Sequence, residues 1–73
     1  MAIHHVLISY ERMSSIGEIL PHHEYGPEEA LMDWCEEEFY ADDSWFTYSS
    51  GNLGYRYEFT SRWEAIMFKL RWA

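Results

Sequence analysis

The sequence predicts a small α+β domain with its elements in the order strand, helix, strand, strand, helix. Three observations predict this order. A run of β-branched and aromatic residues opens the chain, an apolar pattern with helical spacing occupies its middle, and two alternating segments around a glycine-rich turn precede a second helical pattern. Because a chain of 73 residues supports one core, we expect a single domain over residues 1–73.

The first strand is expected over residues 2–10. Val6 and Ile8 lie on either side of Leu7, and this imperfect alternation is typical of a central strand with both faces partly covered. Residues 11–25 are expected to connect this strand to the first helix, with a short helical turn at residues 16–20 at most. Such a connection is long for a small domain, so we expect part of it to be functional or ordered by a partner.

A helix is expected from residue 27 to about residue 40. Pro27 suits the first helical position, and Glu28 and Glu29 favour the positive end of the helix dipole. Apolar residues at helical spacing define its buried face: Ala30, Leu31, Trp34, Cys35 and Phe39. Residues 41–44 are expected to end the helix.

Residues 45–50 and 55–60 predict a β-hairpin, because glycine and asparagine at positions 51–54 permit the backbone angles of a tight turn. Ser61 and Glu64 have the spacing of a capping box, which predicts that a second helix begins there. The alternating pattern of residues 68–72 leaves an edge strand as the alternative for the end of the chain.

This last helix carries two apolar stripes. We expect the first to belong to the core: Trp63, Ile66, Met67 and Leu70. The second consists of Ala65, Phe68 and Trp72, and the basic residues nearby give it the composition of an interface. We expect Phe68 and Trp72 to contact a partner, either another copy of the chain or a different protein. Burial of this stripe beneath residues 11–25 is the alternative.

These elements predict a three-stranded, antiparallel-containing sheet with two helices on one face. A right-handed crossover from the first strand to the second places the third strand between them. The order β-α-β-β-α resembles a truncated ferredoxin-like arrangement.

The cysteine content and the start of the chain indicate the cellular compartment of the protein. A single cysteine, Cys35, excludes an intrachain disulfide. Residues 2–9 are apolar but include His4 and His5 and are too short to cross a bilayer. Because the start of the chain does not have the pattern of a signal peptide, we expect a cytoplasmic protein. An aromatic content of 19% opposes disorder despite a net charge of −8.

The negative charge is concentrated in the middle of the chain. Residues 11–55 contain eleven acidic residues and one basic residue, Arg12, whereas residues 56–73 contain four basic and two acidic residues. Glu29, Asp33 and Glu37 recur every four residues on the predicted helix, about 6 Å apart along its axis. Five further carboxylates widen and extend this band: Glu28, Glu36, Glu38, Asp42 and Asp43.

Duplex DNA is itself a dense line of negative charge, so we interpret the band as a mimic of a nucleic-acid backbone that occupies a basic groove on a partner. A solvated face that keeps the protein soluble is the alternative. The net charge opposes direct binding to nucleic acid.

Catalytic chemistry is not expected. Cys35 lies on the apolar face of a helix among acids that raise a thiol pKa, which disfavours a nucleophile. The pairs His4–His5 and His22–His23 lack the spacing of known metal motifs. A metal-dependent enzyme built on His22, His23 and Glu24 is therefore the weakest hypothesis, and we expect neither a metal nor a cofactor.

The short length, the acidic run over residues 28–43 and the closing pattern over residues 61–72 together resemble small acidic bacteriophage proteins of host takeover and anti-defence. Anti-CRISPR proteins and DNA mimics belong to this type. The resemblance implies inhibition of a host complex that binds nucleic acid. Separately, we expect no contact with a membrane. Because these proteins share no motif, it implies no particular functional residue.

Overall fold

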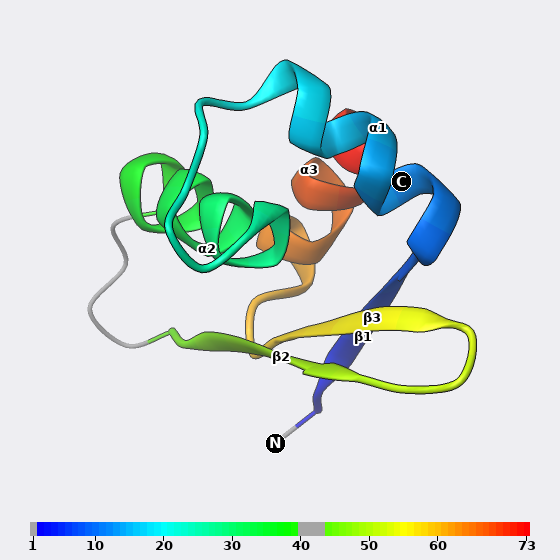
Figure 1. The fold of residues 1–73 in the computed structure, drawn as a ribbon. Coiled ribbons are helices and arrows are strands. Elements are labelled where there is room, and N and C mark those ends of the chain that lie inside the picture. The colour runs from blue at the N-terminus through cyan, green and yellow to red at the C-terminus, as the bar shows by residue number, and fades with distance from the viewer. Residues whose placement is uncertain (1, 40–43) are drawn as a thin grey trace.

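The computed structural model describes residues 2–39 and 44–73. Within these residues the chain forms β1 (His4–Ser9), α1 (Tyr10–Ile19), α2 (Pro27–Glu38), β2 (Phe46–Ser50), β3 (Gly54–Phe59) and α3 (Arg62–Trp72). All three helices lie on the same face of the sheet (Figure 1). The predicted α+β class is therefore confirmed, as are the hairpin and the two predicted helices, and α1 is an additional helix.

The three strands are ordered β1-β3-β2, and β3 pairs antiparallel with both of its neighbours. The predicted position of the third strand between the first two is thus confirmed. The expectation that the first strand is central was wrong, because β1 lies at an edge. Val6 and Ile8 are buried beneath the helices whereas Leu7 is half exposed, since the opposite face of the sheet carries no layer of described residues (Figure 1).

Helix α1 occupies much of the segment that was expected to be a connection. The Ser9 hydroxyl caps it by accepting a hydrogen bond from the Arg12 backbone N–H at 3.1 Å. Met13 and Ile16, one turn apart, are buried against the core. Ser14, Ser15 and Gly17 are weak helix formers, but burial of this apolar pair stabilises the helix.

The start of α3 forms the serine half of the predicted capping box, in which the Ser61 hydroxyl accepts a hydrogen bond from the Glu64 backbone N–H at 3.3 Å. The Glu64 carboxylate accepts a hydrogen bond from the Ser44 hydroxyl at 3.1 Å. The helix continues to Trp72, which excludes an edge strand over residues 68–72. The Arg12 guanidinium donates a hydrogen bond to the Trp72 carbonyl at 2.8 Å and so joins α1 to the end of α3.

The two apolar stripes of α3 were expected the wrong way round: the stripe expected at the surface is buried, and the stripe expected in the core is exposed. Phe68 and Trp72 are 0% and 1% exposed, so they belong to the core and do not form an accessible partner surface. The stripe expected in the core is instead exposed: Trp63, Ile66, Met67 and Leu70. Both stripes are apolar, and the chain buries the one whose rings fill the space between the sheet and the other helices.

Aromatic packing makes up much of this core. The Phe68 ring lies 4.9 Å from the Tyr57 ring and 5.1 Å from the Phe59 ring, between centroids. Trp72 meets Trp34 edge-on at 5.6 Å, which joins α3 to α2. Such pairs add about 0.5–1.5 kcal/mol of stabilisation beyond that of the area that they bury.

None of the described helices has the length and apolar character needed to cross a membrane.

Replacing the capping residue tests the start of α3. The substitution Ser61→Ala removes the acceptor for the Glu64 N–H, so the free energy of unfolding is expected to fall by about 1 kcal/mol. Urea denaturation followed by circular dichroism measures the change. Ser14→Ala, at an exposed position within α1, is the control and is expected to leave stability within about 0.5 kcal/mol of the wild type. Equal stabilities for the two variants would contradict the capping role.

Candidate protein-binding site

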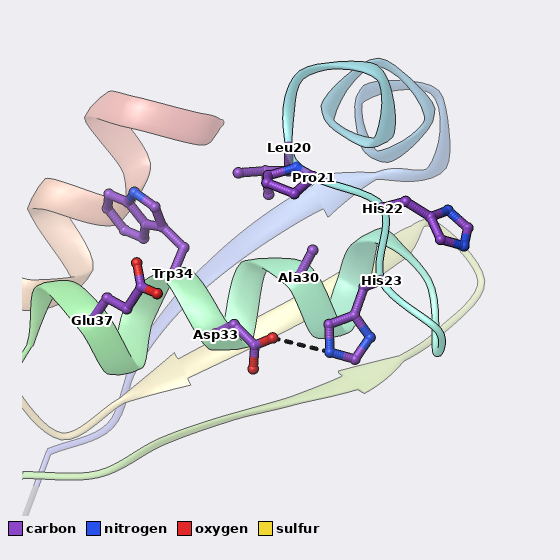
Figure 2. Close-up of a pocket in the computed structure, with 8 residues that line it drawn as sticks. All are labelled: Leu20, Pro21, His22, His23, Ala30, Asp33, Trp34 and Glu37. Carbon is purple, nitrogen blue, oxygen red and sulfur yellow. Dashed lines mark ion pairs between the residues drawn. The ribbon is translucent and has the colours of Figure 1, made fainter.

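A groove of about 250 Å³ lies between the α1–α2 connection and the outer surface of α2 (Figure 2). The connection supplies one wall, with Leu20, Pro21 and both histidines of the pair His22–His23. The helix supplies the other with Ala30, Asp33, Trp34 and Glu37. Two of the carboxylates expected to bind a partner, Asp33 and Glu37, therefore line one concave surface that also has apolar and aromatic walls.

His23 holds the connection against α2. Its Nε2 lies 3.0 Å from Asp33 Oδ2, the contact drawn in Figure 2. Its Nδ1 accepts a hydrogen bond from the Tyr25 backbone N–H at 3.0 Å. Because Nδ1 is an acceptor, a neutral His23 carries its proton on Nε2 and donates it to Asp33. The Asp33 side chain remains 57% exposed, so it keeps capacity to accept further hydrogen bonds at the groove.

Trp34 gives the groove a rigid wall. Its ring meets the rings of Phe39 and Trp72 edge-on, each at 5.6 Å between centroids. One side of Trp34 is thus packed in the core while another lines the groove. Glu37 follows one turn later on α2 and lines the same groove (Figure 2). The groove therefore presents carboxylates beside an aromatic surface.

The carboxyl-terminal end of α2 carries exposed negative charge. Glu36, Glu37 and Glu38 are exposed in its last turns, and that end contains no basic residue. Carboxylates at the negative end of a helix dipole destabilise it by about 0.3–1 kcal/mol each. Among the ion pairs of residues 2–39 and 44–73, none joins a lysine or arginine to a carboxylate of α2. A basic partner would relieve this repulsion.

The first turn of α2 has a different environment. The Tyr48 hydroxyl donates a hydrogen bond to Glu29 Oε1 at 2.7 Å, and the Tyr57 hydroxyl donates one to the Glu28 carbonyl at 2.9 Å. Both glutamates are only partly exposed, and these contacts hold α2 on the sheet. The acidic band that the sequence suggested is therefore divided between an anchoring end and an exposed end. Asp42 and Asp43 lie outside the described residues.

Cys35 is a core residue. Burial raises the pKa of its thiol to about 12, and the negative charges of Glu64 and Glu36 act in the same direction. A thiol with this pKa is almost fully protonated at neutral pH, so it is a poor nucleophile. Within the parts of the chain that the structure describes, no three metal-ligating side chains gather closely enough to hold an ion.

The buried thiol predicts how stability depends on pH. Between the ordinary Cys pKa of 9.0 and the raised value of about 12, the unfolded chain releases a proton that the native protein keeps. The stabilisation is complete below pH 9.0 and is lost as the pH rises through this window. Burial also raises the pKa of Tyr57 above 10.0, which acts with the same sign.

We therefore expect the urea concentration at the unfolding midpoint to decrease as the pH is raised from 8 to about 10.5. The decrease should be smaller in the variant Cys35→Ala. Reference denaturation at pH 7 gives the effect of the substitution itself. A midpoint that stays constant up to about pH 10.5 would contradict this account of the buried thiol.

No family model, no curated protein and no solved structure matches the chain.

Proposed function

We propose that this protein is a non-catalytic binding protein that docks the exposed acidic face of α2 on a basic surface of a partner protein. One observation carries the proposal: Asp33 and Glu37 line a groove with a fixed aromatic wall, next to an exposed helix end whose carboxylates pair with no described lysine or arginine. A solvated acidic face explains charge alone, but it does not explain a groove lined by that charge.

The partner that fits this surface best is one that normally binds nucleic acid. Its basic groove would accept α2 in place of a phosphate backbone, so the protein would act as an inhibitor by occupying the site. Glu36 and Glu37 repeat negative charge along the exposed helix end. They present no nucleobase that a partner could read for sequence. Together with the bacteriophage resemblance, this supports a phage-encoded inhibitor of a host defence or nucleic-acid-processing complex in the bacterial cytoplasm.

The alternative of an assembly subunit loses the residues on which it depended, because Phe68 and Trp72 are buried. The proposed binding role therefore rests on α2, and the predicted binding residues that remain accessible there are Asp33, Glu36 and Glu37.

The proposal is tested by affinity capture from bacterial lysate with nuclease treatment, followed by elution in rising salt. We expect a basic nucleic-acid-binding protein to elute at moderate salt, because exposed ion pairs are screened as ionic strength increases. Adding the purified protein should then displace DNA or RNA from the captured partner. A partner that survives high salt, or that binds nucleic acid and this protein together, would contradict inhibition by mimicry.

A further inference from the structure

We propose that the groove between β1 and α3 binds an extended, acidic peptide segment, which adds to the free edge of β1 as a further strand. This groove has a volume of about 490 Å³ and is distinct from the one on α2. Ile3, His4 and His5 line it at the strand, and Arg62, Ile66 and Lys69 line it at the helix. The site is therefore independent of the proposed function of α2.

The edge of β1 is open to strand addition. In the described sheet β1 pairs with β3 on one side only. Proteins usually protect such edges with proline, lysine or a bulge. The strand contains neither residue type, and its register with β3 runs from His4 opposite Phe59 to Ser9 opposite Gly54 without interruption. An extended chain lying along these six residues could form main-chain hydrogen bonds over about 20 Å.

The side chains at this groove favour an acidic occupant. Three of the five lysine and arginine residues of the chain lie on α3, although the net charge is −8. Arg62 and Lys69 border the groove and form no ion pair with the described residues. Ile3 and Ile66 are both partly exposed there. In an added strand, alternate side chains point to opposite faces of the sheet. A peptide that alternates apolar and acidic side chains would direct the acidic ones toward Arg62 and Lys69 on α3, and the apolar ones to the face on which Leu7 is exposed.

A second copy of this chain fits the groove less well. Pairing β1 with another β1 would bring the sequence His4–Ser9, which has no carboxylate, and would place further histidines near Arg62 and Lys69. The other edge strand, Phe46–Ser50, also lacks a carboxylate. Charge complementarity therefore points to a different, acidic chain, whose negative charges would be steered toward α3.

The test uses a short synthetic peptide in which valine and glutamate alternate, titrated into the isotopically labelled protein and followed by NMR. We expect shifts of the backbone amides of β1 and α3, and weak or no binding by the matching valine–lysine peptide. The substitution Lys69→Glu should weaken binding about tenfold. Arg71→Glu makes the same charge change in the same turn of α3, but its side chain does not line the groove, so it should have a much smaller effect.

A second pair of peptides tests strand addition itself. Methylation of alternate backbone nitrogens should abolish binding in one register and spare it in the other, because only alternate N–H groups face β1. Three results would overturn the proposal. They are equal binding of the glutamate and lysine peptides, full binding by both of the methylated peptides, or a protein dimer that pairs through β1. Peptide binding by the variant Asp33→Lys/Glu37→Lys should be retained, which separates this site from the one on α2.

Discussion

The substitution Phe68→Ala is expected to destabilise the domain by about 3–5 kcal/mol. Phe68 is fully buried, and its ring contacts the rings of Trp34, Tyr57 and Phe59. The stability of a whole domain is only about 5–15 kcal/mol, and a chain this short lies toward the lower limit. The variant should therefore be largely unfolded at 37 °C, as measured by urea denaturation and near-ultraviolet circular dichroism.

Leu70→Ala is the matched control on the opposite side of α3. Leu70 is 82% exposed, so its truncation should change stability by no more than about 0.5 kcal/mol. The sequence pattern alone favours the opposite outcome, with Leu70 in the core and Phe68 at the surface. If Leu70→Ala were the more damaging change, the orientation of α3 described here would be wrong.

The substitution Gly54→Ala is expected to cost about 3 kcal/mol. Gly54 has a φ of +151°, and a Cβ there would lie 2.8 Å from the Ser9 Cα and 2.9 Å from the Ile8 carbonyl carbon. These are backbone atoms of the paired strand, so relief requires β1 and β3 to separate. Thermal denaturation and the backbone amide shifts of β1 measure the effect.

Gly51→Ala in the same hairpin is the control. A Cβ at Gly51 would have its closest contact at 3.9 Å, with the Gly54 carbonyl oxygen, which is an ordinary van der Waals distance. This variant should therefore fold normally. Equal destabilisation by the two substitutions would indicate that general turn flexibility, and not the approach of β1, makes glycine necessary at position 54.

The hairpin, α2 and the start of α3 were predictable because local signals specify them. Strict alternation, a proline at the first helical position and a capping serine each act over a few residues. Helix α1 was missed because its serines and glycine have low helix propensity. The signal that remains is the Ser9 cap together with Met13 and Ile16 one turn apart, and Pro21 just after the helix end.

The side of α3 that packs in the core was not predictable from the sequence of the helix itself. Both stripes are apolar, so the choice depends on which neighbouring surfaces are available for packing. The groove on α2 was predictable only in part, because one of its walls also depends on tertiary packing. The spacing of Asp33 and Glu37 placed them on one face of α2, but the wall formed by Leu20, Pro21 and His23 depends on how the α1–α2 connection folds back.

The measurement that tests the central claim most directly is affinity capture with three baits of defined charge. The first is the wild type, the second is Asp33→Lys/Glu37→Lys, and the third is Glu11→Lys/Glu18→Lys, which makes the same charge change at exposed positions of α1. Circular dichroism first confirms that all three are folded, and quantitative mass spectrometry compares what each retains.

We expect the wild type and the α1 variant to retain the same basic partner and the α2 variant to lose it. Equal retention by all three baits, or equal loss from both variants, would contradict a specific binding role for the acidic face of α2.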